Sequence, residues 1–147
     1  MANIVPYSFP VELLKGNHDF VNDTYTISLY TSIAAYSTAS TVFTATGEVS
    51  SGGGSQYAAQ NLTGNAVSNV ANYATVDFTD SVWGSPTPAT FSAAYGAIYN
   101  SSATNKLIVV LDFGGTKSCS NGTFTVTFPS PTSGSPSGAD ALLSIQS

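Results

Sequence analysis

The sequence predicts an all-β protein, an antiparallel β-sandwich with one short N-terminal helix. Three observations predict this class. Several segments alternate apolar and hydroxyl side chains with a period of two residues, which is typical of half-buried strands. Turns rich in Gly, Pro and Asn separate these segments. Only residues 10–16 carry both the start and the stop signals of a helix. The 147 residues fit a single domain that can bury about two-thirds of its unfolded surface.

The expected helix is only one or two turns long. Pro10 stands where a helix can begin, and Glu12 falls in the first turn. Lys15 lies near the end, and Gly16 provides a C-terminal stop.

Three segments carry the strand alternation most clearly: 24–29, 73–78 and 123–128. Threonine and aromatic residues dominate them, and a pleated, half-buried surface favours both types. The side chains expected on the buried faces are Tyr25, Ile27 and Leu29; Ala74, Val76 and Phe78; and Phe124, Val126 and Phe128.

Two further segments have different patterns. Residues 106–113 are apolar on both faces, which predicts a central strand covered on each side. Residues 91–99 use small side chains, as expected where another layer approaches closely. The polar stretch 100–105 between them has the length of a hairpin connection.

Loops divide the rest of the chain. A second hairpin loop is expected to hold Cys119 between Gly114-Gly115 and Asn121-Gly122, because an Asn-Gly pair with strands on both sides is a hairpin signal. With seven to nine short strands and no second helix, we expect a two-sheet sandwich in a jelly-roll order, which tolerates long crossing loops. The remaining loops are 50–55, 84–88 and the spacer 129–138, after which 141–145 is expected to close a sheet as the last strand.

Charge is scarce in this chain. Three Lys, no Arg and eight acidic residues give a net charge of −5. Nucleic-acid binders neutralise phosphates with several basic residues, and anionic membranes attract polybasic segments, so we expect neither as a partner. No apolar run approaches the ~20 residues of a membrane-spanning helix, and the chain begins without the pattern of a secretory signal. The single Cys119 excludes an internal disulfide framework.

Residues with catalytic potential are few. His18 is the only histidine, and it stands beside Asp19. The nearest nucleophile candidate, Ser55, follows two glycines but lacks the second glycine of a nucleophile elbow. We therefore expect a structural or surface role for His18 and no enzymatic activity. A hydrolase that uses His18 is the third-ranked hypothesis.

No metal or other cofactor is expected either. Zinc needs about four His, Cys or carboxylate ligands, and this chain has one His and one Cys. Asp77 with Asp80, or Asp19 with Asp23, would supply only two oxygen ligands each to calcium, and neither pair lies in an EF-hand loop.

The residues that we single out for contacts with other proteins lie in two places. Residues 1–10 form an apolar N-terminal arm ahead of the single domain 11–147, and the arm either packs along the sandwich or binds a neighbouring subunit. Trp83 lies near a Pro-rich loop and is expected in the core, at a subunit contact or as a platform for a sugar. The candidate interface residues are Ile4, Val5, Tyr7, Phe9, Trp83, Pro86 and Pro88.

The order of motifs along the chain resembles a known family. The motifs are Phe-Pro-Val-Glu-Leu-Leu at 9–14, Asn-Asp-Thr-Tyr-Thr-Ile-Ser-Leu-Tyr at 22–30, Gly-Glu-Val at 47–49, the segment 73–78 with Trp83, Ala-Ile-Tyr-Asn at 97–100, 107–113 followed by Gly-Gly, and Gly-Thr-Phe-Thr-Val at 122–126. This order resembles small structural proteins of tailed bacteriophages that act as head decoration or cement proteins. The resemblance covers roughly residues 9–128 and rests on strand patterns. It implies a jelly-roll-like fold, trimers on the capsid surface and no enzymatic activity, and it carries over no site residues.

The resemblance and the composition together predict a virion structural protein. We expect it to decorate and cement the capsid through contacts with the major capsid protein, as a homotrimer, after assembly in the bacterial host cytoplasm. Serine and threonine number 40 in the chain, and hydrogen bonds from such a surface depend less on salt than ion pairs do. The alternative is a carbohydrate- or receptor-binding module of a phage tail or fibre, with Trp83 as a stacking platform.

Overall fold

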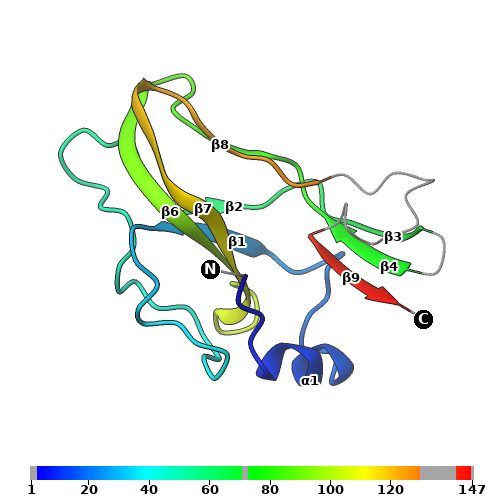
Figure 1. Ribbon diagram of the computed structural model, residues 1–147. Coiled ribbons are helices and arrows are strands. Elements are labelled where there is room, and N and C mark those ends of the chain that lie inside the picture. The colour runs from blue at the N-terminus through cyan, green and yellow to red at the C-terminus, as the bar shows by residue number, and fades with distance from the viewer. Residues whose placement is uncertain (1–2, 71–72, 130–141, 147) are drawn as a thin grey trace.

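The computed structural model describes residues 3–70, 73–129 and 142–146, and it confirms an all-β sandwich with one short helix (Figure 1). The described chain contains nine strands. The elements are α1 Ser8–Leu14, β1 Tyr25–Tyr30, β2 Gln60–Asn61, β3 Ala66–Val70, β4 Tyr73–Asp77, β5 Ser81–Trp83, β6 Ala89–Asn100, β7 Lys106–Gly122, β8 Phe124–Val126 and β9 Leu143–Gln146.

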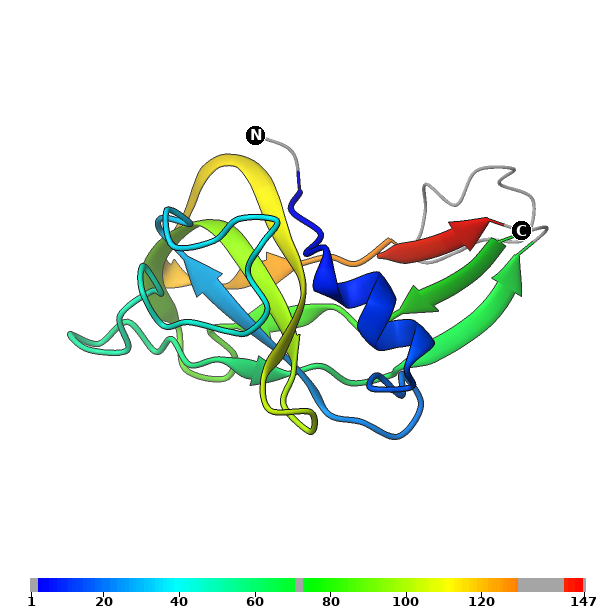
Figure 2. The same ribbon diagram turned by 90° about the horizontal axis from the view of Figure 1, so that it is seen from below.

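All strand pairings are antiparallel, and they form three hydrogen-bonded sheets. The strand orders are β2-β1-β6-β7, β3-β4-β9 and β5-β8. Seen from below, α1 lies between the largest sheet and the β3-β4-β9 sheet (Figure 2). A standard jelly roll has two main sheets, so the described strands confirm the sandwich architecture and leave the jelly-roll order a prediction.

The centre of the largest sheet is buried on both faces. Every residue of β1 is buried, so the predicted half-buried strand is wrong. On one face, Tyr25, Ile27 and Leu29 belong to the main hydrophobic core. On the other face, Tyr30 packs with Tyr36 in a second, smaller core. The reason is tertiary: the long segment after β1 folds back over the face that the alternation assigns to solvent.

Strands β6 and β7 form a long hairpin. Their pairing ends at Asn100 opposite Lys106, which confirms 100–105 as the hairpin connection. Gly96 of β6 does allow a close approach, but of the neighbouring strand β7 and not of another layer, because a Cβ on Gly96 would lie 3.1 Å from the ring of Phe113.

The outer edge of β7 is engaged by other parts of the chain. Residues 107–110 are buried on both faces as predicted, but β7 is the last strand of its sheet and not a central one. Single β-bridges join its edge to Ile4 and Val42. These bridges and the second core help to bury residues 107–110, whereas the sequence pattern predicts that flanking strands bury them.

The second hairpin predicted around Cys119 is wrong. β7 continues through this region, and Cys119 is buried opposite Phe91 of β6. The Gly114-Gly115 pair makes an irregularity in the β6–β7 register instead of a turn. Asn121-Gly122 does precede a strand, but that strand, β8, pairs with β5. Continued pairing with β6 and burial of Cys119 outweigh the local turn signal.

The other strand predictions have mixed outcomes. In β8 and its flanks, Phe124, Val126 and Phe128 are buried as predicted. In β4 and the residue after it the prediction holds in part: Phe78 is buried in the main core and Val76 packs against that core, but Ala74 is exposed. Thr75 is buried instead, with its hydroxyl hydrogen-bonded to Ser68. The last strand is confirmed as β9, which pairs with β4. Of the predicted spacer 129–138, all but Pro129 lies outside the described residues.

Helix α1 begins at Ser8 rather than Pro10, and it ends as predicted before Gly16. Gly16 has a φ of 72°, which glycine adopts without strain. The N–H groups of Gly16 and Asn17 donate to the carbonyls of Leu13 and Glu12 respectively. These two bonds make the Schellman arrangement that satisfies the last carbonyls of a helix.

The connection from β7 to β8 passes close to a glycine after β5. Gly84 has a φ of 91°, and a Cβ there would lie 2.2 Å from the carbonyl oxygen of Gly122. Gly53 also has a positive φ, 67°, but nothing lies within 4 Å of its added Cβ.

We expect Gly53→Ala to lower the free energy of unfolding by about 1 kcal/mol for backbone strain alone. Gly84→Ala should lose about 1–3 kcal/mol more, because packed atoms must move. Urea unfolding measures both losses, and equal losses would contradict the close approach at Gly84.

Candidate functional site

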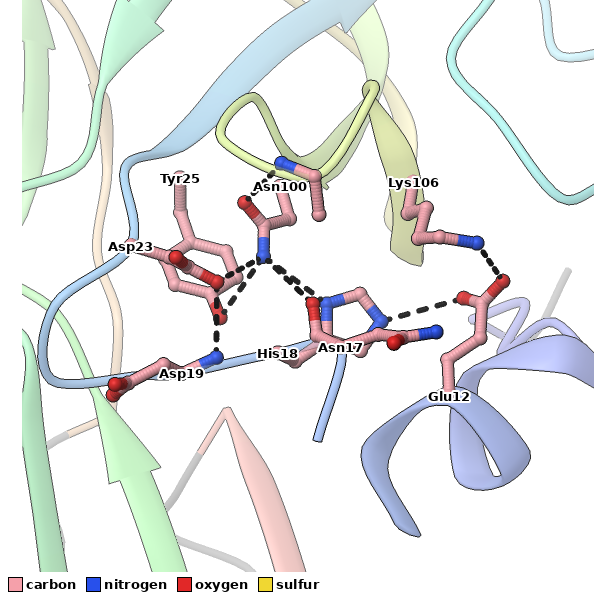
Figure 3. Close-up of polar contacts among 9 residues, drawn as sticks. Glu12, Asn17, His18, Asp19, Asp23, Tyr25, Asn100 and Lys106 are labelled. Atoms are coloured by element: carbon pink, nitrogen blue, oxygen red, sulfur yellow. Dashed lines mark hydrogen bonds and ion pairs between the residues drawn. The ribbon is translucent and has the colours of Figure 1, made fainter. Parts of the chain in front are cut away.

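Polar side chains from distant parts of the chain meet in one buried cluster (Figure 3). Helix α1 provides Glu12, the following loop provides His18 and Asp23, the end of β6 provides Asn100, and the start of β7 provides Lys106. We call these five residues the polar cluster. It contains the only histidine and two of the eight carboxylate side chains of the sequence, which are the residue types that acid–base catalysis uses.

Asn100 fixes the geometry of the polar cluster. Its side chain is fully buried, and Oδ1 accepts hydrogen bonds from the backbone N–H groups of Ser102 at 3.0 Å and Ala103 at 3.1 Å. The orientation of the amide follows, because the other end must then be the NH₂ group. This Nδ2 donates to Oδ2 of Asp23 at 2.7 Å and to Nδ1 of His18 at 3.3 Å.

These contacts determine the protonation state of His18. Since Nδ1 accepts from Asn100, the ring hydrogen of the neutral form sits on Nε2, which donates to Oε2 of Glu12 at 3.3 Å. Burial lowers the pKa of His18 below its ordinary 6.5, and the opposing effect of Glu12 is smaller. The ring also packs beside Phe9, with centroids 5.4 Å apart. His18 is therefore a neutral, buried link between Glu12 and Asn100.

The two acidic groups of the polar cluster have separate partners. The Glu12 carboxylate, besides its bond to His18, forms an ion pair with the Lys106 ammonium. Asp23 accepts from Asn100 and from the backbone N–H of Asp19 at 3.0 Å. The Asp19 side chain turns to solvent, where hydrogen bonds from Asn22 and the Val21 N–H lower its pKa. The neighbouring Tyr25 hydroxyl lies within 3.5 Å of Asn100, and burial raises its pKa.

This arrangement connects elements of the fold and engages both ring nitrogens of His18. A serine–histidine relay needs a hydroxyl on one ring nitrogen. In His18, Asn100 occupies Nδ1 and Glu12 occupies Nε2, and the side chain is 0% exposed. In residues 3–70, 73–129 and 142–146, no serine hydroxyl bonds to this ring. The geometry agrees with the structural role expected for His18, because it ties α1 to the β6–β7 hairpin.

Among the described residues, no group of three or more His, Cys, Asp or Glu side chains could hold a metal ion. Asp77 and Asp80 instead each accept a backbone hydrogen bond, from Phe78 and Phe128 respectively. The helices of the described chain include none that is long and apolar enough to cross a membrane.

The N-terminal interface candidates divide into buried and exposed residues. Ile4 exchanges two backbone hydrogen bonds of 2.8 Å with Val110, and it is half-buried. Phe9 lies in the main core at 6% exposure, so it is not available to a partner. Val5 and Tyr7 are exposed. Of the two alternatives for this arm, its described part packs along its own sandwich, and residues 8–10 belong to α1.

The second group of candidates surrounds Trp83. Its side chain is only 2% exposed, and the indole N–H donates to the carbonyl of Ala58 at 2.7 Å. The ring also packs edge-on against Phe91 and Phe124. Trp83 is thus a core residue, and the prediction of a sugar-stacking platform at this position is wrong because neither ring face is open. Pro86 and Pro88 are exposed.

One exposed surface includes only one of the predicted interface residues, Tyr7. Tyr7 is 74% exposed, Val11 50% and Leu14 90%. Their spacing of four and three residues places them in one row along α1, and we call this row the outer face of α1. The opposite face is buried through Phe9 and Glu12. Apolar residues on both faces of a helix are a sequence signal for this surface. The signal becomes visible only when the helix is predicted to begin before Pro10.

Comparisons with protein-family models, with curated proteins and with solved structures find no match to this chain.

The polar cluster predicts a strong effect of one isosteric change. Asn100→Asp replaces the donor Nδ2 by a carboxylate oxygen that faces Asp23 at about the present 2.7 Å. Because the buried carboxylate at position 100 would then repel the half-buried Asp23 and His18 would lose its donor, we expect the free energy of unfolding to fall by about 3 kcal/mol or more. The control Asn121→Asp lies on an exposed position and should change it by less than about 0.5 kcal/mol. Similar losses in the two variants, measured by urea unfolding, would contradict the assigned role of Asn100.

The buried His18 also predicts a pH dependence. Its folded-state pKa is lowered below 6.5, so the unfolded chain binds more protons in the interval between the two values. Stability from this group is full above pH 6.5 and is lost as the pH falls from there toward the folded-state pKa. We expect urea unfolding to show this decrease in the wild type and not in His18→Gln. An identical pH profile for the two proteins would rule out His18 as its source, and the imidazole signals in NMR report the pKa directly.

Proposed function

We propose that this protein decorates and cements the capsid of a tailed bacteriophage, as a homotrimer that binds the major capsid protein on the virion surface. The proposal combines the motif order of the sequence with one structural observation, the exposed apolar outer face of α1. It involves no catalysis, cofactor, nucleic acid or membrane.

The outer face of α1 is the observation that carries the proposal. Single exposed apolar residues are normal on protein surfaces. Three in one row on a single short helix, whose other face is already buried, suggest a protein partner. Fully burying a side chain such as Leu14 contributes about 1.5–3 kcal/mol, so this row is worth a substantial part of a binding energy.

The polar part of the surface supports the same proposal. Only 11 residues of the chain are charged, whereas exposed threonines are frequent, for example Thr123, Thr125 and Thr127 on β8 and its flanks. Neutral hydroxyls can form the polar rim of an interface without the cost of desolvating charges. Contacts of this kind also weaken less with rising salt than ion pairs do.

A trimer would multiply a modest contact. Three copies around one axis present three outer faces of α1 to the capsid at once. Binding of the second and third copies is then intramolecular, and avidity can exceed the affinity of one contact by a factor of about 10²–10⁴. The trimer itself is predicted from the family resemblance.

Co-sedimentation with capsids that lack this protein tests the proposal. We expect the wild type to be a trimer by light scattering and to sediment with the particles. Leu14→Ser should weaken capsid binding by about tenfold or more, which corresponds to about 1.4 kcal/mol. Val82→Ser is the matched control, since Val82 is also exposed but lies on β5 and not on α1. A monomer that never sediments with particles would overturn the proposal.

A further inference from the structure

A cleft opens between β7 and β8, two strands that are adjacent in sequence but do not pair. They diverge after Gly122 (Figure 1), and the cleft between them has a volume of about 650 Å³. Binding sites commonly measure about 300–1,000 Å³. Leu111 and Phe113 of β7 line one side, and the segment Thr123–Thr127 lines the other.

The orientation of the β8 backbone follows from its pairing with β5. Val82 lies opposite Thr125 in this ladder, and its carbonyl accepts a hydrogen bond from Gln60 Nε2 at 2.8 Å, outside the ladder. In an antiparallel ladder, opposed residues either exchange both backbone hydrogen bonds or direct both groups outward. Val82 and Thr125 therefore form an outward-directed pair. The N–H and C=O of Thr125 point away from β5.

A second contact agrees with this orientation. The N–H of Phe128 donates to Oδ1 of Asp80, the residue just before β5, at 2.9 Å. Even-numbered residues of this segment thus direct their backbone groups to the β5 side. The backbone groups of Thr123, Thr125 and Thr127 are directed to the other side, and within the described ranges none of them has a hydrogen-bond partner.

The side chains around the cleft add selectivity. Leu111 and Phe113 are half-buried and offer an apolar wall. Two charged residues line the cleft. The carboxylate of Asp112 accepts a hydrogen bond from the N–H of Gly114 at 2.9 Å, whereas Lys117 is exposed and has no ion-pair partner among the described residues. The ammonium of Lys117 therefore favours an occupant that carries an acidic side chain.

We infer that this cleft is a strand-addition site for an extended, acidic segment of the capsid protein. The segment pairs with the free edge at Thr123, Thr125 and Thr127, so that the sheet β5-β8 gains a third strand. Backbone hydrogen bonds supply the affinity in this mode of recognition, and alternate side chains supply the specificity. One set of side chains packs on Leu111 and Phe113, and an acidic residue pairs with Lys117. This inference rests on the proposed function and names the kind of segment that its partner provides.

Hydrogen exchange on the full chain tests the site without a capsid. The probe is the acetylated and amidated peptide Thr-Val-Asp-Val-Thr-Val, and its neutral counterpart has Asn for Asp. In the free protein, the amides of Thr123, Thr125 and Thr127 should exchange as fast as those of exposed loops. Saturating acidic peptide should slow them by about tenfold or more. Slow exchange in the free protein would mean that the chain itself covers the edge, and unchanged exchange with peptide would mean that no strand adds. Either result overturns the inference.

Three variants separate backbone, side-chain and charge contributions. Thr125→Pro removes the N–H that faces the cleft and should abolish binding, whereas Thr125→Val keeps the N–H and should bind within about twofold of the wild type. Lys117→Gln should abolish the preference for the acidic over the neutral peptide. Undiminished binding by Thr125→Pro would overturn the inference. If that variant does not fold, the exchange result on the wild type decides.

Competition connects the cleft to the capsid. Saturating acidic peptide should weaken co-sedimentation of the wild type with capsids by about tenfold, and unchanged co-sedimentation would overturn the assignment to the capsid protein. Peptide binding and capsid binding are measured separately. A protein that sediments with capsids but binds no peptide therefore refutes the cleft inference alone, and a protein that never sediments refutes the proposed function.

Discussion

The buried carboxamide of Asn100 is the interaction on which the rest of this structure depends. It stands at the end of β6, the strand that pairs with both β1 and β7. One end of the amide holds the hairpin turn, and the other end holds His18 and Asp23. A buried polar group of this kind must keep all its partners, because each unmet hydrogen bond costs its full desolvation energy. The amide therefore couples α1, the start of β1 and the β6–β7 hairpin into one unit.

Sequence patterns predict the fold class well and individual strand environments less well. The alternation at 123–128 is correct because one face of β8 does meet solvent. The similar alternation at 24–29 is misleading, because Thr26 and Ser28 are buried with hydrogen bonds to Asn61 and Tyr99. A local pattern cannot distinguish a hydroxyl bonded to water from one bonded to another strand. The prediction of a loop at Cys119 is wrong for a related reason. Pairing of β7 with β6, which is distant in sequence, determines the structure there, and the local turn signal does not reveal it.

The polar cluster was beyond prediction from the sequence. Asn100 is separated from His18 by 82 positions, and in the sequence it is one of several turn-forming asparagines. The outer face of α1 was easier to predict, because a row of apolar residues at helical spacing is visible in the sequence once the start of the helix is known. The cleft could not be predicted from the sequence either, since it depends on which edge of β8 is paired with β5. On the proposed function, a molecule with two such surfaces can join two separate elements of a shell.

The bridges of Ile4 and Val42 to the outer edge of β7 have a consequence for how copies of this chain can associate. An exposed edge on a long strand with an apolar run, such as residues 107–111 of β7, can pair with the same strand of another molecule, and repetition of that contact gives fibres. Here the chain occupies that edge itself at two points, so the largest sheet cannot be extended there without first displacing its own N-terminal segment. The open edge of β8 belongs to a strand of only three residues, which offers room for a single added strand but no template for repeated growth.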